Sequence, residues 1–422
     1  MSKWFGRRGL FISGGIAFWI LRIYYWLITK EIPFSDMADY NSIALKILHN
    51  LDFSHDSFWQ SYQSPGLPAL RAIQMAFLGQ SLIGWQIFQT LILFLGLVWL
   101  VYEVRKQTKS WWLSLSLLWI VALSKSSIFW SYKIATEGIV EAFSYLAIAS
   151  TLFSLRMRKR SAFFLTGIVY AILLLIRPNF FIITPLFIFM FIIQSLYSKN
   201  VISKKKIQET FVLLGFFSLG IFLLWSPWLF RSYSLYKHIV PFNTHGAYTF
   251  LWEIGNVEVK MNNKIVRTSV QDLQNEAPKK FSNDYAAYTY AEGIASKWLS
   301  ENLNEYDDLF IKRLYSSSVK RDIYLTKVSR IQLYPNVVNN ILIDKSVMFI
   351  LLGFIGLLVL TIQFKYFYIF VIIGIAPWLG SLLALGYPRM FEPSIPIVIF
   401  GSMACLLVLE KGIKRLKIIR NI

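Results

Sequence analysis

Hydrophobic residues gather in long blocks along this 422-residue chain, and polar segments separate the blocks. Each block runs for roughly 15 to 22 residues, which is about the length that an α-helix needs to cross a bilayer. The blocks begin near Leu10, Leu82, Trp111, Ile134, Ser161, Phe180, Thr210, Val347, Tyr366 and Ile395. The pattern predicts an all-α polytopic membrane protein with about ten transmembrane helices.

Two polar segments are too long to be simple turns between spans. The first, about 30–80, contains "NSIALKILHNL" and "GLPALRAIQMAFLG", in which apolar residues recur at helical spacing over stretches too short to span. We expect two amphipathic helices at the membrane interface here. The second, about 231–345, is polar and shows a helical pattern around "DYAAYTYAEGIASKWLSENL", which predicts a small extracytoplasmic subdomain. The expected organisation is a seven-span module over 1–230, this subdomain, and a three-span module over 346–422.

The charge distribution orients these predicted spans. The chain is 56% hydrophobic and carries a formal net charge of +20, but its basic residues form short clusters between spans, which argues against nucleic-acid binding. "EVRKQTK", "RMRKR", "SKNVISKKK" and "KGIKRLKIIR" all fall on one side, whereas the shorter connections on the other side carry few Lys and Arg. The positive-inside rule therefore predicts cytoplasmic amino and carboxy termini and places both long segments outside. Compact loops and the lack of a eukaryotic retention signal favour a bacterial inner membrane.

The first span and the metal-ligating residue types add two further expectations. "MSKWFGRRGLFISGGIAFWI" has a basic region followed by an apolar stretch without a small-residue cleavage site, which predicts a retained signal-anchor. Cys405 is the single cysteine, so an internal disulfide framework and a cysteine metal cluster are excluded. The four histidines show no metal-ligand spacing, and no cofactor is predicted from them.

Asp36 and Asp39 follow the first hydrophobic block directly, in "IPFSDMADYNSIALKIL". On a helix that begins near Ser35, the two carboxylates would project from one side, beside Tyr40. One interpretation is structural, in which Ser35 caps the helix and the acids stabilise the positive end of its dipole. The other is functional, because an enzyme acting on a lipid-linked substrate would place its base at this outer edge of a span.

A second group of charges lies in the fourth predicted span. "SYKIATEGIVEAF" places Lys133, Glu137 and Glu141 at i, i+4 and i+8, which would form one stripe on a helix. Acids in membrane helices are costly, so they usually face a bundle interior or a wet cavity. Glu137, near the outer end, is the functional candidate, and Glu141 is interpreted as structural; an internal Lys–Glu pair is the alternative.

Four arginines are also unusual for their positions: Arg22 in the first span, and Arg177, Arg231 and Arg389 at outer ends of later spans. Snorkelling of long side chains to the interface is the simplest explanation. Alternatively, several guanidinium groups at outer ends could converge on a phosphate, which arginine binds through paired hydrogen bonds. Together with the acids, they indicate an anionic substrate at the outer leaflet.

The order of these motifs resembles the C-class integral-membrane glycosyltransferases, in the branch of the protein O-mannosyltransferases and the aminoarabinose transferase of lipid A. The similarity covers nearly the whole chain, although each motif is short. The motifs that carry it are "SDMADY", "SYQSPGLPAL", "ATEG", "RPNFF", "SPWLFRSYSLYKHIVPFNTHGAYTFLWEIGN" and "YPRMFEPSIPI". The resemblance implies a helical bundle whose outward cavity accepts a polyprenyl-phosphate sugar and transfers the sugar with inversion.

The resemblance also implies roles for individual residues. Asp36 corresponds to the family's catalytic acid and would assist the acceptor hydroxyl as it attacks the anomeric carbon. Arginine suits the negative charge that gathers on the leaving phosphate. The expected donor-phosphate ligands are Arg177, Arg231 and Arg389. The expected sugar-site residues are Tyr40, Tyr62 and Gln63.

The sequence departs from the family pattern at two of these motifs. The common Asp-Glu pair reads Asp36-Met37 here, which leaves Asp39 as the second carboxylate. The turn that often carries Glu-Lys before proline reads Gln63-Ser64, so the arginines would have to supply the phosphate-binding charge. Asp39 and Glu137 would either hold a divalent cation or orient the acceptor, and the sequence does not choose between these roles.

Two other functions remain open at the level of the sequence. A lipid-linked oligosaccharide ligase or polymerase would show a similar number of spans and one large outer loop, and would rely on a basic pair in that loop. A polyprenyl-lipid flippase or transporter would place its charges near mid-membrane in broken helices. The donor sugar and the acceptor, whether a protein, a lipid or a glycan, are not specified by the sequence.

Overall fold

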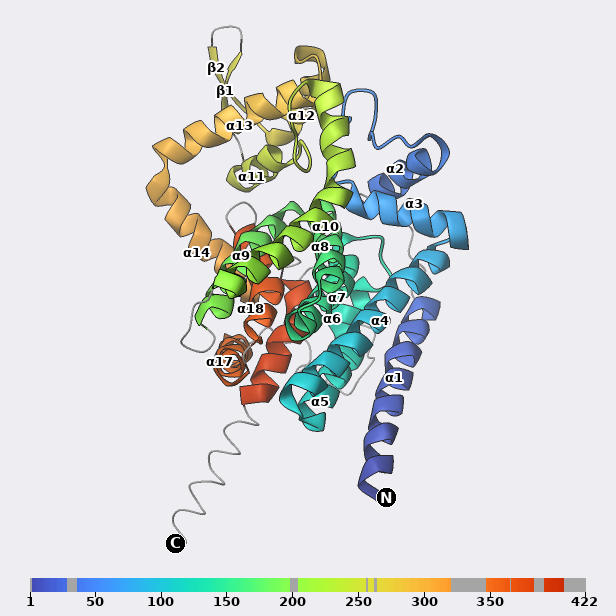
Figure 1. The fold of residues 1–422 in the computed structure, drawn as a ribbon. Helices are drawn as coiled ribbons and strands as arrows, with labels where there is room; N and C mark the ends of the chain where they lie inside the picture. The colour runs from blue at the N-terminus through green and yellow to red at the C-terminus, as the bar shows by residue number, and fades with distance from the viewer. Residues whose placement is uncertain are drawn as a thin grey trace.

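The computed structural model of the chain describes residues 2–28, 36–197, 204–255, 257–261, 264–319, 347–364, 366–382 and 391–405. Helices make up most of this part of the chain, and they divide into an apolar bundle and a more polar region over one end of it (Figure 1). The predicted all-α polytopic architecture is therefore confirmed.

Apolar helices occupy every predicted span. Five helical segments in the described residues are long and apolar enough to cross a membrane: α1 (Ser2–Ile28), α4 (Leu82–Thr108), α7 (Thr136–Met157), η1 with α9 (Pro178–Ile182 and Ile183–Tyr197), and α10 (Lys204–Tyr236). Shorter apolar helices match the other spans: α5 (Trp111–Leu123), α8 (Arg160–Ile176), α17 (Val347–Gln363), α18 with α19 (Tyr368–Gly374 and Ala376–Ser381), and Ile395–Cys405. A short buried helix, α6 (Lys125–Trp130), lies between α5 and α7.

The centre of the bundle is α7. The most apolar 18-residue window of this helix is 89% buried, and α4, α8 and α18 pack around it. The helix begins at Thr136, so Lys133 lies in the preceding turn and does not share a helical stripe with Glu137 and Glu141. A stripe that includes Lys133 would require the helix to begin about one turn before Thr136. That part of the prediction is therefore wrong. The Lys133 ammonium lies over the Phe129 ring, 4.6 Å from its centroid.

Close contact between backbones holds α8 against α10. A Cβ on Gly167 of α8 would lie 2.0 Å from the carbonyl oxygen of Phe217 on α10, so only glycine fits there. Small residues at such crossings allow membrane helices to gain van der Waals contact that lipid tails cannot replace. The α10 helix continues beyond this crossing to Tyr236 with Pro227 inside it, so the predicted domain boundary at Arg231 falls within the helix.

The outer surface of α1 is apolar, as expected of a helix that faces lipid. Ile12, Ile16 and Ile20 recur at intervals of four residues and are 59%, 53% and 59% exposed. The opposite side of the helix packs mainly on α5. Exposed apolar residues on one side and protein contacts on the other are typical of a transmembrane helix at the edge of a bundle.

The long first connection forms two helices, as predicted. These are α2 (Asp36–Asn50) and α3 (Gly66–Leu78), which lie side by side across one end of the bundle (Figure 1). They share a small apolar cluster formed by Ile43, Ala44, Ile47, Ala72 and Met75. Residues 51–65 connect them as an ordered loop, which we call the first loop.

The second long segment folds over the same end of the bundle (Figure 1). It contains α11 (Gly246–Ile254), the antiparallel strands β1 (Val257–Met261) and β2 (Lys264–Thr268), α12 (Val270–Lys280), α13 (Asp284–Glu301) and α14 (Leu303–Val319). We call these elements the cap. The helix predicted around "DYAAYTYAEGIASKWLSENL" is confirmed as α13, whereas the hairpin was not predicted. A separate apolar cluster that includes Tyr248, Leu251 and Leu273 gives the cap its own core.

Candidate active site

The first helical turn of α2 presents the two acids that the sequence singled out. Asp36 is the first residue of the helix, and Asp39 follows one turn later; both are half-buried. Carboxylates in a first turn are stabilised by the positive end of the helix dipole. Ser35, the predicted cap, and Arg389, a predicted phosphate ligand, lie outside the described residues.

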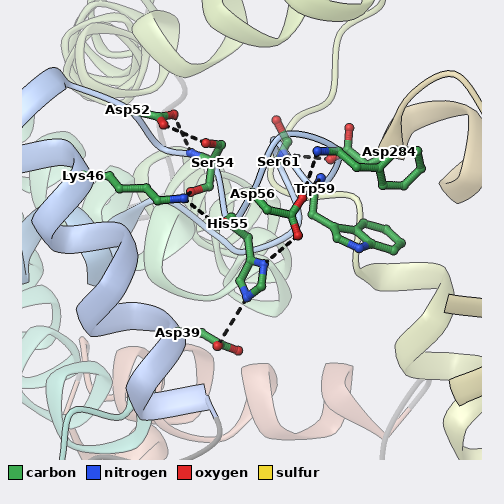
Figure 2. Close-up of polar contacts among 10 residues, drawn as sticks. Asp39, Lys46, Asp52, Ser54, His55, Asp56, Trp59, Ser61 and Asp284 are labelled. Carbon is green, nitrogen blue, oxygen red and sulfur yellow. Dashed lines mark hydrogen bonds and ion pairs between the residues drawn. The ribbon is translucent and has the colours of Figure 1, made fainter. Parts of the chain in front are cut away.

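A histidine of the first loop connects two acids. His55 Nε2 lies 3.3 Å from Asp39 Oδ1, and His55 Nδ1 lies 3.3 Å from Asp56 Oδ2 (Figure 2). The hydrogen bond with Asp39 raises the pKa of His55 above its ordinary value, and the contact with Asp56 acts in the same direction. Desolvation opposes both effects and is smaller than the contribution of the Asp39 bond. The two carboxylates therefore stabilise the charged form of His55 relative to the neutral form.

Short hydrogen bonds within the first loop fix the position of His55. Asp56 Oδ1 accepts from the backbone N–H groups of Phe58 at 2.8 Å and Trp59 at 2.7 Å. Lys46 Nζ donates to the carbonyl oxygen of His55 itself at 2.7 Å (Figure 2). The backbone donors and His55 lower the pKa of Asp56 despite its partial burial. Hydrogen bonds thus fix both the backbone and the ring of His55.

The far end of the first loop is tied to the cap and to α10. The backbone N–H of Ser61 donates to Asp284 Oδ2 at 2.8 Å, and Thr244 Oγ1 donates to the same oxygen at 3.0 Å. Arg231 donates through Nη1 to Ser61 Oγ at 3.0 Å and through Nη2 to the carbonyl oxygen of Gln60 at 2.9 Å. Asp284 is fully buried (Figure 2). The bonds made by Ser61 and Gln60 join segments that are 170 or more residues apart in the sequence.

Tyr62 packs within an aromatic group between the first loop and the cap. Its ring centroid lies 4.9 Å from that of Trp59 and 4.4 Å from that of His245. Gln274 Nε2 of α12 donates to Tyr62 Oη at 2.9 Å. Burial is the main cause that raises the pKa of Tyr62, and the carboxylates of Asp36 and Asp39 raise it further. That electrostatic effect places Tyr62 in the neighbourhood of the acid pair.

The other residues predicted for the sugar site lie in the same region. Tyr40 is half-buried in α2 and packs against the main apolar core. Gln63 is half-buried in the first loop, next to Tyr62 in the chain. Both positions are compatible with lining a site beside Asp36, and their role remains a prediction.

A second charged group lies deeper, between α7 and α8. Arg177, at the end of α8, forms an ion pair through Nη2 with Glu137 Oε1 and donates through Nε to Thr136 Oγ1 at 3.0 Å. The Glu137 side chain is 3% exposed and that of Arg177 is 11% exposed. The "ATEG" and "RPNFF" motifs therefore meet in space, whereas Arg231 is bonded to the first loop, and convergence of the arginines on a phosphate stays a prediction.

A narrow pocket opens beside this ion pair. Arg177 lines it together with Asn179, Ser144 and Trp378, so α7, η1 and α19 all contribute. Asn179 Nδ2 donates to the carbonyl oxygen of Pro377 at 2.8 Å, which ties η1 to α19. The pocket therefore joins the amino-terminal and carboxy-terminal parts of the bundle.

The proline-rich turn between the two charged groups packs directly against the end of α8. Gly66 begins α3, and a Cβ at this position would lie 2.5 Å from Ile176 N and 2.5 Å from the carbonyl carbon of Leu175. These atoms belong to the last turn of α8, which leads directly into Arg177. The first loop therefore ends on the backbone that positions the buried arginine.

Two residues of this site, His55 and Asp284, were not predicted as functional. His55 follows no ligand spacing, and Asp284 occurs in a segment predicted only as helical. The paired "Asn-Asp" at the start of α13 is typical of the first residues of a helix, and it could have indicated that Asp284 lies at a buried helix start. Among the residues that the structure describes, no group of three or more His, Cys, Asp and Glu side chains is arranged to hold a metal ion.

No family model matches the sequence, and no curated protein does. The fold, however, is similar to that of a solved membrane oligosaccharyltransferase, which agrees at the level of architecture with the resemblance noted in the sequence. The chain is similar to the oligosaccharyltransferase AglB from the archaeon Archaeoglobus fulgidus, solved with an inhibitory peptide and a dolichol-phosphate. The TM-score is 0.57 at 12% identity, over 99% of this chain and 52% of that one.

Two further solved structures extend this likeness. The apo form of the Archaeoglobus fulgidus oligosaccharyltransferase aligns with a TM-score of 0.55 at 13% identity, over 98% of this chain. ArnT from Cupriavidus metallidurans, bound to undecaprenyl phosphate, aligns with a TM-score of 0.43 at 10% identity, over 94% of this chain and 77% of that one. The chain spans about half the length of the oligosaccharyltransferase structures it matches.

Proposed function

We propose that this integral membrane protein is an inverting glycosyltransferase that moves a sugar from a polyprenyl-phosphate donor to an acceptor on the outer side of the membrane. The observation that carries the proposal is the half-buried acid pair of Asp36 and Asp39 at the exposed start of α2. The acids lie at the end of a bundle whose fold is shared with an oligosaccharyltransferase solved with a dolichol-phosphate. A bacterial inner membrane and cytoplasmic termini follow from the loop charges as part of the same proposal.

Asp36 is the proposed general base. It is the first residue of α2 and half-buried, so its side chain lies at the amino-terminal, positive end of the helix dipole. It would accept the proton of the acceptor hydroxyl as that oxygen attacks the anomeric carbon, while the bond to the lipid phosphate breaks. Asp39 would hold the acceptor or the first loop in place through His55.

Arg177 is the proposed contact for the leaving phosphate. Its Nε and Nη2 are committed to Thr136 and Glu137, and in the described part of the chain no hydrogen bond involves Nη1. A donor phosphate could therefore accept from Nη1 without breaking the ion pair, but the neighbouring pocket, with a volume of about 10 Å³, would first have to widen. Arg231 supports the first loop in the structure, so its direct contact with phosphate would require these bonds to rearrange.

Transfer of radiolabelled sugar in isolated membranes tests the proposal. Wild type, Asp36→Asn and Asp308→Asn would be compared at matched abundance with polyprenyl-phosphate donors carrying one sugar or an oligosaccharide. Loss of a general base lowers rates by roughly 10² to 10⁴-fold, so we expect transfer to fall by at least about 100-fold in Asp36→Asn. Asp308, an exposed acid of α14, serves as the matched control and should retain full transfer.

Two results would contradict this assignment. Undiminished transfer by Asp36→Asn would remove Asp36 as the base and redirect attention to the cap, as in the ligase or polymerase alternative. Movement of the labelled lipid across the membrane by wild type, without any transfer, would instead favour the transporter alternative.

A further inference from the structure

The first two turns of α4 contact the segment that connects α6 to α7. Three side chains on these turns, all buried, donate hydrogen bonds to backbone carbonyl groups of that segment. The bonds run from Trp85 Nε1 to the carbonyl oxygen of Lys133 at 2.9 Å, from Gln86 Nε2 to that of Tyr132 at 3.3 Å, and from Gln89 Nε2 to that of Trp130 at 2.8 Å. The α4 helix therefore fixes the backbone that leads into α7.

These carbonyl groups lie where regular helical bonding stops. The α6 helix ends at Trp130 and α7 begins at Thr136, and residues 131–135 between them are buried and not helical. The last carbonyl groups of a helix have no partner within it, and a buried backbone acceptor is costly when it is unsatisfied. Inside a membrane, no bulk water is present to replace a missing donor. The side chains of α4 therefore satisfy backbone groups that the non-helical segment leaves open.

The bond from Gln89 lies directly against the first turn of α7. A Cβ on Gly138 would lie 2.4 Å from the carbonyl oxygen of Trp130 and 2.5 Å from Gln89 Nε2, so only glycine allows this approach. The backbone of α7 thus packs on the two atoms that form the bond. The bond therefore sets the position of the turn that begins at Thr136.

We propose that Gln89 is a positioning residue for the donor phosphate and acts through the first turn of α7. Thr136 and Glu137 in that turn hold Nε and Nη2 of Arg177, so the bond from Gln89 fixes the direction in which the guanidinium group faces. Arginine binds phosphate through directed hydrogen bonds, and a misplacement of about 1 Å can lower a rate by about 100-fold. This role rests on the proposed contact between Arg177 and the leaving phosphate.

The same pair of helices offers a matched control for a purely structural role. Near the other end of both helices, Gln107 Nε2 donates to the carbonyl oxygen of Leu152 at 3.5 Å. This bond also joins α4 to α7, but it lies far along α7 from Thr136. Loss of the Gln107 bond should therefore affect packing of the two helices without moving the first turn of α7.

The test compares Gln89→Met and Gln107→Met in the full chain, because methionine removes the donor and keeps a side chain of similar length. Equilibrium binding of polyprenyl phosphate without a sugar and the melting temperature would be measured in detergent, and the KM for the sugar-carrying donor in membranes. We expect Gln89→Met to weaken binding of polyprenyl phosphate and to raise the donor KM by at least about tenfold. Gln107→Met should bind polyprenyl phosphate as wild type does, even where its melting temperature falls.

A second substitution shows whether the effect passes through Arg177. In an Arg177→Gln background, Gln89→Met should weaken binding of polyprenyl phosphate no further. Equal weakening in Gln89→Met and Gln107→Met, or unchanged binding in Gln89→Met, would overturn the positioning role alone. Wild type that binds no polyprenyl phosphate would overturn the proposed function and this role with it. Gln86→Met removes the longer bond to Tyr132 and should weaken binding less, which gives a reading if Gln89→Met does not fold.

Discussion

The two charged groups of the site differ in how they are held. The Glu137–Arg177 pair lies in the bundle, with side chains 3% and 11% exposed, and each charge has its counter-charge. The Asp39–His55 pair lies above the bundle, with side chains 37% and 34% exposed, and it can exchange protons with solvent. Loss of one partner should therefore cost more stability in the buried pair than in the exposed pair, so substitutions in the two groups should affect different measurements.

The largest expected effect follows from breaking the buried pair. Arg177→Ala would remove the arginine that pairs with the buried Glu137, and removing one member of a buried pair typically costs about 3–5 kcal/mol. The melting temperature in detergent should fall sharply, and Glu137→Gln in the same chain should restore part of it. Arg158→Ala, which breaks the exposed pair with Glu209, is the control and should change stability by less than about 1 kcal/mol. Equal effects of the two substitutions would show that the pair is not effectively buried.

The next effect concerns the contact that connects the two groups. Gly66→Ala would force a Cβ against the backbone of Ile176 and Leu175, and overpacking of this kind costs about 1–3 kcal/mol. Because α3 and the end of α8 must separate, we expect transfer activity to fall with stability. Gly293→Ala, where a Cβ meets nothing within 4 Å, should leave both unchanged. Full activity in Gly66→Ala would show that the first loop and Arg177 act independently.

A smaller effect is expected where the first loop meets α10. Arg231→Gln would weaken the hydrogen bonds to Ser61 and Gln60, but glutamine keeps an N–H donor, so we expect a loss of about 0.5–1.5 kcal/mol. We expect faster proteolysis within the first loop and about tenfold slower transfer. The control is Lys237→Gln, at the exposed position after α10. Unchanged proteolysis would show that the bonds to Asp284 are sufficient to hold the loop.

The smallest effect is a pH dependence of the exposed pair. The pKa of His55 is raised in the folded protein, so the contact with Asp39 contributes fully below the unfolded value of about 6.5 and is lost as pH rises through the folded value. The difference in melting temperature between wild type and His55→Ala should shrink between about pH 6 and pH 8. Partial exposure limits the contribution to less than about 1 kcal/mol. Ser57→Ala, which changes an exposed residue of the first loop that does not titrate, is the control and should show no such trend.

The sequence predicted the spans for a clear physical reason. Hydrophobic blocks longer than about 15 residues have few alternatives to a membrane helix, so the positions of α1, α4, α7 and α10 followed from length alone. Charges within such blocks must be paired or face a cavity, which indicated Glu137 and Arg177 before their contact was seen.

The loops were less predictable because their contacts are long-range and polar. Nothing near His55 in the chain indicates that Asp39 and Asp56 would hold its two nitrogens, and nothing near Ser61 indicates Asp284. Lys133 was placed on a helix because the spacing fitted, but the turn before Thr136 removes it from that helix. Such contacts depend on how α10 and the cap fold back over the first loop.

Pro227 marks the point at which the α10 helix bends most easily. Proline lacks the N–H that would bond the carbonyl of Leu223, so bending costs least at this point of the helix. Arg231 lies one turn further on and is bonded to the first loop, which is in turn bonded to the cap through Asp284. The outer end of α10, the first loop and the cap are therefore connected by hydrogen bonds. A change of tilt at Pro227 would move all three together relative to the membrane-embedded part of the bundle.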